Sequence, residues 1–282
     1  MDARGGVRPP ECAGRFYPAD AARLAATVDR LLAEVPTSAA DDEAPVALVV
    51  PHAGFIYSGR VAAAAYRRLV EQRGHVRRVV ILGPAHFARR IDAAVPEWSA
   101  FATPLGEIEV DQSGCALAAG LPAVTFSAGA HAREHFIEVQ LPFLQRSLGA
   151  DISIVPIAVG RVEMRPLADV ISALWTDEST AVVVSTDLSH YQDQATAEQL
   201  DGRTAEAILR QDPLAIGEGA ACGRYPLRAL LEVTRERSLR MRQLDLRTSA
   251  DTTGDRSNVV GYGAFAAYAH GQRFEDAARW AD

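Results

Sequence analysis

Three histidines follow directly on short apolar runs, a position from which side chains could bind a metal. His52 follows VALVVP, His86 follows VVILGPA and His190 follows VVVSTDLS. Imidazole is the commonest protein ligand for zinc, iron and copper, and two neutral imidazoles with one anionic ligand hold a divalent ion while leaving positions open for chemistry. A single histidine in such a place is more often a hydrogen-bonded structural group, so the prediction depends on the recurrence of the pattern.

Two residues are candidates for the anionic ligand, because both lie in turn-like sequences. They are Cys222 in AACGRYP and Asp187 in STDLSHY. Cys222 also precedes a predicted helix, whose N-terminal dipole should lower the pKa of the thiol and favour the thiolate. The alternatives are a buried inert cysteine for Cys222 and a helix N-cap for Asp187. Inert roles are expected for Cys12 and Cys115.

Other polar residues could act beside a metal rather than on it. Asp187 and His190 could form a pair in which one orients a ligand and the other moves protons. His135, in AREHFIEVQLPFL, is a candidate pocket residue near the start of a predicted helix. Glu134 and Glu138 could cap or pair there, so a structural role for this segment competes with lining the pocket.

The apolar runs before these residues are continuous and rich in valine, as in strands buried on both faces. Helical patterns alternate with them, which predicts an α/β fold with a largely parallel central sheet flanked by helices. Ligands bind at the carboxyl ends of the strands in such sheets, which is where the histidines fall. The expected strands are 44–51, 76–82, 152–159, 180–184, 238–248 and 258–269, and the expected helices are 59–70, 111–119, 134–148, 166–175, 195–210 and 222–235.

The organisation of the chain predicts a single domain over residues 1–282, since no repeat or composition shift marks a boundary. With 48% hydrophobic and 23% charged residues, the chain is of the ordinary folded, globular class. The polar stretches 35–43 and 249–257 are predicted to be flexible.

The net charge of -7 argues against sequence-independent binding to nucleic acid. The arginine-rich stretches 67–78 and 235–247 are interpreted as solvated faces rather than anion sites, and His75 and His270 as solvated. No run approaches a membrane span, the N-terminus lacks the apolar core of a signal peptide, and three scattered cysteines do not suggest disulfides. A cytoplasmic protein without membrane contact is expected.

Seven ordered sequence blocks resemble the Memo family (AmmeMemoRadiSam system protein B-like), and together they cover nearly the whole chain. They are FYPAD at Phe16, VPHAGFIYSG at Val50, ILGPAHF at Ile81, EHFIEVQLPFLQ at Glu134, STDLSHY at Ser185, CGRYP at Cys222 and GYGAF at Gly261. PHAG alone would be a weak signal, whereas seven blocks in order are specific.

The resemblance implies a fold similar to class III extradiol ring-cleaving dioxygenases, which hold Fe(II) by two histidines and a glutamate. His52 and His86 match the two histidine ligands, and Cys222 matches the position that the Memo family uses in place of the glutamate. His190 is similar to the acid/base histidine of the dioxygenases, and Asp187 lies beside it in the family's pocket.

Two features qualify what the resemblance implies. A thiolate is softer than a carboxylate, so zinc and copper join Fe(II), the expected cofactor, as plausible metals, and ring cleavage is put in doubt. Phe136 stands where many relatives carry serine, which removes a hydroxyl from the pocket region.

The leading functional hypothesis is an iron-dependent, dioxygenase-like oxidoreductase acting on a small molecule or peptide. A second is a non-enzymatic module that binds a peptide or protein in the same pocket, as has been proposed for eukaryotic members, and a third is a zinc-dependent hydrolase. Bacterial relatives often accompany a radical-SAM protein and a small accessory protein, which implies these as partners.

Overall fold

The computed structural model describes residues 5–36, 43–88 and 90–269. Four parallel strands form its centre, in the order β8 (Ser153–Val159), β3 (Arg78–Pro84), β9 (Thr180–Ser185) and β2 (Ala47–Val50). Their residues are buried almost throughout, which is why both faces of these strands are apolar. The prediction of an α/β fold with a largely parallel central sheet is confirmed.

Antiparallel strands extend one edge of the sheet. β12 (Val259–Tyr268) pairs antiparallel with β2, and it also pairs with β10 (His190–Gln192) and β11 (Arg240–Thr248). Because β12 pairs with both β2 and β10, it places the segment that contains His190 near the ends of the central strands.

The other edge is built from short strands that the sequence analysis did not predict. β6 (Gly106–Val110) lies parallel to β8 and is followed by β5 (Ala100–Thr103) and β1 (Val7–Arg8), while β4 (Ala93–Val95) pairs with both β8 and β7 (Val124–Phe126). Strands of two to five residues are too short for a clear periodic pattern, which is why they were missed.

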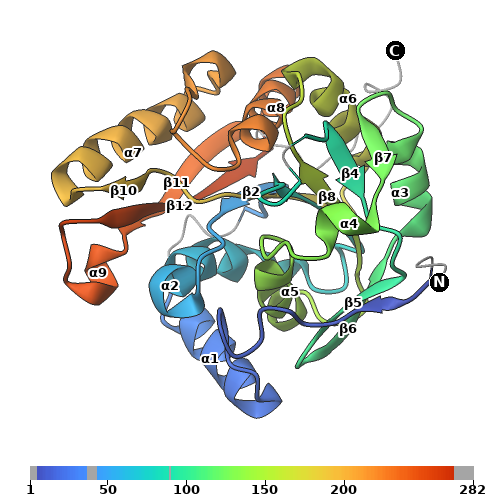
Figure 1. Cartoon of the computed structure of the whole chain (residues 1–282), viewed down its shortest axis with the longest axis horizontal. Coiled ribbons are helices and arrows are strands. Elements are labelled where there is room, and N and C mark those ends of the chain that lie inside the picture. The colour runs from blue at the N-terminus through green and yellow to red at the C-terminus, as the bar shows by residue number, and fades with distance from the viewer. Residues whose placement is uncertain (1–4, 37–42, 89, 270–282) are drawn as a thin grey trace.

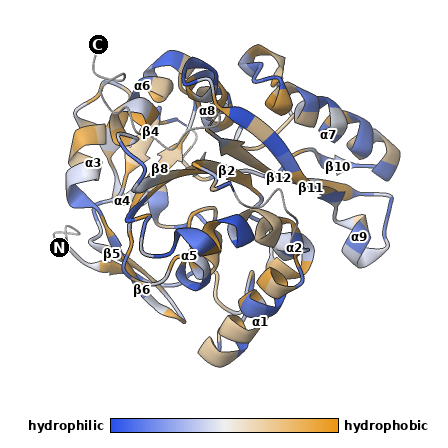
Figure 2. Cartoon of the chain, turned by 180° about the vertical axis from the view of Figure 1, so that it is seen from behind, coloured by the Kyte–Doolittle hydropathy of each residue, from blue (hydrophilic) through white to orange (hydrophobic). Residues whose placement is uncertain are grey.

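Helices cover both faces of the sheet (Figure 1). One face carries α1 (Ala21–Ala33), α2 (Phe55–Tyr66) with η2 (Arg67–Gln72), and α5 (Leu141–Ser147); the other carries α3 (Gln112–Ala119), α6 (Met164–Leu174) and α8 (Arg224–Glu236). α7 (Gln194–Leu209) packs on β11 and β12, and the short α4 (Ala128–His131), η3 (Glu138–Gln140), η4 (Pro213–Ala215) and α9 (Ala250–Thr253) lie in connections. Figure 2 shows the hydrophobic colouring concentrated on the strands between these layers.

The predicted helix 134–148 is too long at its start. Residues 134–137 form a loop, and helical structure begins only with η3 at Glu138. The buried guanidinium of Arg8 binds the carbonyl oxygen of Glu134 at 2.7 Å and the carboxylate of Glu138 at 2.6 Å. Arg8, which is far away along the chain, therefore binds both the loop and the first residue of η3, and the loop does not continue the helix.

The two predicted flexible stretches have different outcomes. Residues 249–257 contain the helical turn α9, and the backbone of Ser249 pairs with that of Val260, while flexibility of this stretch stays a prediction. Of the stretch 35–43, residues 37–42 lie outside the described residues. No helix within the described ranges has the length and apolar character needed to cross a bilayer.

Candidate metal centre

The carboxyl ends of the central strands bring His52, His86 and Cys222 together. His52 follows β2, His86 follows β3, and Cys222 immediately precedes the N-cap of α8. Their potential ligand atoms lie within 4.8 Å of one another, although Cys222 is 170 residues from His52. The convergence that the sequence predicted for these three side chains is present in the structure.

Hydrogen bonding defines which nitrogen of His52 faces this cluster. The Ser185 hydroxyl donates its hydrogen to the carbonyl oxygen of Phe136 at 2.9 Å and accepts from Gln140 Nε2 at 2.9 Å. His52 Nδ1 lies 3.0 Å from the same oxygen and must therefore be the donor. Nε2 of His52 consequently carries a lone pair, and it lies 3.3 Å from the sulfur of Cys222.

His86 has the same tautomer for a different reason. Its Nδ1 lies 2.9 Å from Oε2 of the buried Glu134, and Oε1 of that carboxylate accepts the backbone N–H of Phe87 at 2.9 Å. A carboxylate oxygen accepts hydrogen bonds, so Nδ1 is the donor and the lone pair of the ring lies on Nε2. A carboxylate behind a histidine is the usual support of a metal ligand. Sequence reasoning missed this role, because it treated Glu134 as a helix-capping residue.

The sulfur of Cys222 is held by the strand-end segment of β9. The backbone N–H of Asp187 donates to the sulfur at 3.2 Å, and the Thr186 hydroxyl lies 3.5 Å from it. The next residue must be small, since a Cβ on Gly223 would lie 2.8 Å from Thr186 Cβ. Burial and then the charge of Asp187 raise the pKa of Cys222 to about 12. The prediction that the helix dipole lowers this pKa is wrong, because desolvation outweighs the dipole.

Asp187 positions two of the candidate ligands. Its Oδ1 accepts the backbone N–H of His52 at 2.8 Å, its own N–H binds Cys222, and its Oδ2 lies 4.0 Å from His52 Nε2. Burial raises the pKa of this carboxyl group. The alternative of a helix N-cap is wrong, since the nearest following helix, α7, is capped by Asp193.

His135, the predicted pocket candidate, lies beside two of the candidate ligands. Its ring stacks on that of His86, with centroids 4.7 Å apart, and meets the ring of His52 edge-on at 5.1 Å. Phe16 lies 4.8 Å from it by ring centroids. Burial and then the neighbouring histidines lower the pKa of His135 to about 3, so its ring is neutral. With His86 and Glu134 it forms a second group of ligand-type atoms within 4.8 Å.

His190 stands at the start of β10 and is only partly buried. Its Nδ1 donates to the carbonyl oxygen of Leu188 at 2.8 Å, which leaves Nε2 as the proton acceptor. The charged form of His190 would lower the pKa of both His52 and Asp187, so it lies within electrostatic range of the cluster.

Exposed apolar side chains follow the site histidines along the chain. Ile56 and Tyr57 are 72% and 40% exposed, Phe87 is 55% exposed and Tyr191 is 74% exposed. The charges of Tyr57, Tyr191 and Asp187 all act on Tyr262, so these residues are neighbours. Phe136, by contrast, is fully buried and occupies the space beside Gly83, where a Cβ would come within 2.2 Å of its ring.

A second buried polar cluster lies behind the loop that carries Glu134 and His135. Arg8 and Glu138, 1% and 0% exposed, pair at 2.6 Å. Glu138 also accepts from Cys12 N at 2.6 Å, Tyr17 Oη at 2.5 Å and Glu11 N at 3.0 Å. Sequence analysis did not single out Arg8. We name this group the Arg8 cluster, and include His131, whose carbonyl oxygen accepts from Arg8 Nε at 3.2 Å.

The remaining interpretations hold in part: Arg237 of the second arginine-rich stretch is half-buried on the ring of Trp175 rather than solvated. His75 is exposed, and the arginine-rich stretches include surface pairs such as Arg240 and Arg242 with Glu43. Cys12 and Cys115 are buried free thiols whose pKa values are raised by burial, which fits inert roles. His270 lies outside the described residues.

The chain is similar in sequence and in fold to known proteins. A family model described as "Memo-like protein" matches residues 8–266. A MEMO1 family protein of Ignicoccus hospitalis is 37% identical over 280 residues, covering 92% of this chain and 97% of the relative, and one of Aquifex aeolicus is 33% identical, covering 91% and 97%. The crystal structure of Escherichia coli K12 protein JW3007 aligns with a TM-score of 0.50 at 15% identity, covering 78% of this chain and 98% of that one, and shows a shared fold.

Proposed function

Because this chain belongs to the Memo-like family, and because its strand ends gather a metal-ligand set, we propose that it binds one metal ion through His52, His86 and Cys222. The observation that carries the proposal is the direction of the lone pairs. One ring nitrogen of each histidine and the sulfur of Cys222 lie within 4.8 Å of one another, while Nδ1 of each ring is hydrogen-bonded to Ser185 or Glu134.

The donor set suits a mononuclear centre with open positions. Two neutral imidazoles and a thiolate supply three ligands, which leaves room for substrate. Binding requires the buried Cys222 thiol to lose its proton, so metal uptake should release a proton. We propose Fe(II) as the metal, with zinc and copper as the competitors that a sulfur ligand admits.

The proposed activity is a dioxygenase-like oxidation of a small molecule or peptide. Bound iron would supply one-electron redox chemistry that the side chains lack. His190 would hold or move a proton at Nε2, since its Nδ1 is committed to Leu188. Asp187 keeps His52 and Cys222 in place, and the neutral His135 and Phe16 exclude water from one side.

A second candidate function, recognition of a peptide or protein without catalysis, is favoured by the exposed apolar side chains near the site. Ile56, Phe87 and Tyr191 are each more than half exposed, an arrangement that suits contact with a partner. In that case metal binding would support the shape of the pocket.

Metal loading of matched cysteine variants tests the metal centre. Wild type, Cys222→Ser and Cys115→Ser are loaded anaerobically with Fe(II), and bound metal is measured after desalting. Wild type and Cys115→Ser, the control at a buried cysteine away from the site, should retain iron at about one per chain, and Cys222→Ser should not. Equal retention by Cys222→Ser would contradict the ligand assignment.

Oxygen uptake tests the activity separately. The iron-loaded protein is mixed with a panel of catechols and other reductants, and oxygen consumption is followed. Metal-dependent uptake that is lost in His190→Gln would support an oxidoreductase. Iron retention without turnover across the panel would contradict that activity and favour the binding function.

We further propose that the protein acts in the cytoplasm, where Cys222 stays reduced, beside a radical-SAM protein and a small accessory protein. Affinity purification from its native cells should recover these partners together with the chain. Their absence under gentle, anaerobic conditions would contradict this part of the proposal.

A further inference from the structure

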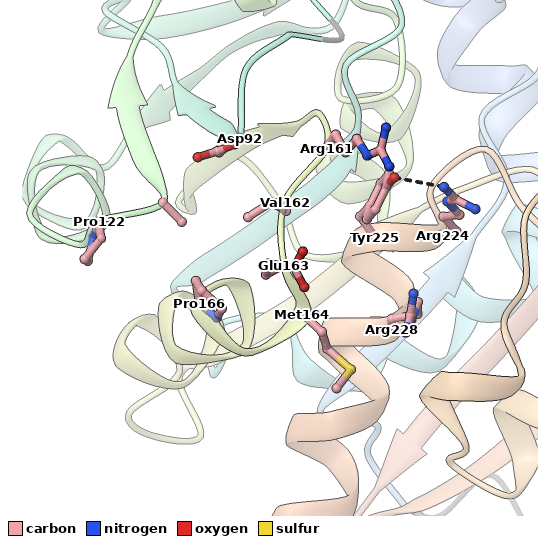
Figure 3. A pocket seen from close by; sticks show the side chains of 11 residues that line it. Asp92, Pro122, Arg161, Val162, Glu163, Met164, Pro166, Arg224, Tyr225 and Arg228 are labelled. Carbon is pink, nitrogen blue, oxygen red and sulfur yellow. Dashed lines mark hydrogen bonds between the residues drawn. The ribbon is translucent and has the colours of Figure 1, made fainter.

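A pocket of about 600 Å³ lies beside the carboxyl end of β8, next to α6 and α8 (Figure 3). Its walls come from the loop after β8, the starts of α6 and α8, and the residues just before β7. None of the three candidate metal ligands lines it. It is therefore a cavity separate from the candidate metal centre.

Three arginines line this pocket. Arg161 lies on the loop after β8, while Arg224 and Arg228 are four residues apart on α8 and so share one face of that helix. Figure 3 shows Arg161 and Arg224 beside Tyr225, with Arg228 further along α8. The guanidinium of Arg224 donates to the Tyr225 hydroxyl at 2.9 Å and lies 4.7 Å from its ring centroid, so its position is fixed.

Two of these arginines lack an acidic partner. Among the residues that the structure describes, the side chains of Arg161, which is exposed, and Arg228, which is half-buried, form no hydrogen bond or ion pair, and Nε of Arg228 is buried without an acceptor. The half-buried Arg237, by contrast, donates to the carbonyl oxygen of Trp175 at 2.8 Å. In a chain of net charge -7, three arginines that line one pocket, two of them with side chains that pair with no carboxylate, suit an anion from outside the chain.

The residues that line the pocket indicate which kind of anion would bind there. Guanidinium groups donate in a fork that matches the oxygens of phosphate, and α8 begins here with no side-chain cap on its first amides. Asp92 and Glu163 line the same pocket and accept hydrogen bonds, which suits hydroxyl groups. The volume exceeds the needs of a bare ion and suits a small organic molecule.

We propose that this pocket binds a phosphate monoester of a hydroxylated small molecule. The phosphate lies against Arg161 and Arg228, and the hydroxyl groups of the body face Asp92 and Glu163. Inorganic phosphate would satisfy only the arginines, and a neutral sugar only the two carboxylates. A molecule that carries both parts should therefore bind more tightly than either part alone.

Calorimetric titration with ribose 5-phosphate at constant ionic strength tests the proposal. The proteins are wild type, Arg161→Met, Arg228→Met and the control Arg165→Met, whose arginine lies outside the pocket and pairs with Asp169 at 2.8 Å. Methionine keeps the length of the side chain and removes the charge. Saturable binding by wild type should weaken at least ten-fold in the two pocket variants and stay unchanged in the control.

Three further measurements decide the result. Ribose and inorganic phosphate should each bind at least ten-fold more weakly than ribose 5-phosphate, and removal of metal with a chelator should leave binding unchanged. Circular dichroism checks that the variants are folded. Absence of saturable binding by the wild type, equal weakening in Arg165→Met, or inorganic phosphate binding as tightly as the ester would overturn the proposal, and would leave the metal centre untouched.

Discussion

Two polar clusters meet at the loop 131–138, and they differ in how their charged and metal-binding groups are paired. In the Arg8 cluster, both oxygens of Glu138 accept from donors at 3.0 Å or less, and the guanidinium ends on Glu138 and two carbonyls. In the candidate metal centre, Nε2 of His52 and the sulfur of Cys222 face each other with His86 beside them. A carboxylate paired with a buried guanidinium serves the fold, whereas converging lone pairs suit an ion.

Glu134 joins the two clusters. Its carbonyl oxygen accepts from Arg8 at 2.7 Å, and its carboxylate holds His86 and the backbone of Phe87. The Arg8 cluster therefore sets the position of a residue that orients a candidate ligand. The comparison predicts that substitutions in the Arg8 cluster lower the free energy of unfolding with or without metal. Substitutions in the candidate metal centre should mainly lower the affinity for metal.

The largest effect is expected from Arg8→Met. It leaves the carboxylate of Glu138 buried without its cation, and breaking such a pair typically costs about 3–5 kcal/mol. Urea unfolding of metal-free protein measures the change. The double variant Arg8→Met with Glu138→Gln should recover part of the loss, because it removes the uncompensated charge. A decrease in the free energy of unfolding of less than about 1 kcal/mol in Arg8→Met would contradict the structural role of the Arg8 cluster.

His131 should make the Arg8 cluster sensitive to acid. Burial lowers the pKa of His131 to about 4 from an ordinary value of 6.5. Between these two pH values the unfolded chain binds a proton at His131 and the folded chain does not. This contribution to stability is therefore present above about pH 6.5 and is lost as the pH falls to about 4. The loss is on the order of 3 kcal/mol.

Unfolding of wild type and His131→Gln between pH 7 and pH 4 checks this contribution. The variant should show a shallower fall in stability over that interval. Some slope will remain in both proteins, since His52 and His135 also have lowered pKa values. An equal fall in stability with pH in the two proteins would show that protonation of His131 does not cause the loss.

The candidate metal centre should respond to metal rather than to loss of internal contacts. A ligand present at a hundred times its dissociation constant stabilises the folded state by about 2.7 kcal/mol. Wild type should gain this stability with Fe(II) under anaerobic conditions, as measured by urea unfolding. Cys222→Ser should gain none, while its metal-free stability stays within about 1 kcal/mol of wild type. Equal stabilisation of both proteins would remove Cys222 from the site.

The smallest effect is expected from Glu134→Gln. The amide offers one accepting oxygen where His86 Nδ1 and Phe87 N each now use one, so the support of His86 weakens. Loss of such a partner typically costs 10–100-fold in metal affinity. Competitive chelator titration measures the change, with the exposed Glu109→Gln as the control of equal charge. Unaltered affinity would place Glu134 in the structural cluster alone.

Much of the fold could be predicted from the sequence, because continuous valine-rich runs signal strands covered on both faces. The strands β2, β3 and β9 were expected close to their observed bounds, and so were the histidines at their ends. The short strands between residues 93 and 126 carry too few residues for a periodic signal. The prediction that one domain spans residues 1–282 remains a prediction, and the family model covers residues 8–266.

The sequence by itself determined which side chains could meet, because parallel strands bring their carboxyl ends to one edge of the sheet whatever lies between them. Only the tertiary structure decided how those side chains are held. The partners of His52 and His86, namely Ser185 and Glu134, lie more than forty residues away along the chain. Likewise, the helix after Cys222 predicted a lowered pKa, but burial raises it, and burial depends on every element that packs around the thiol.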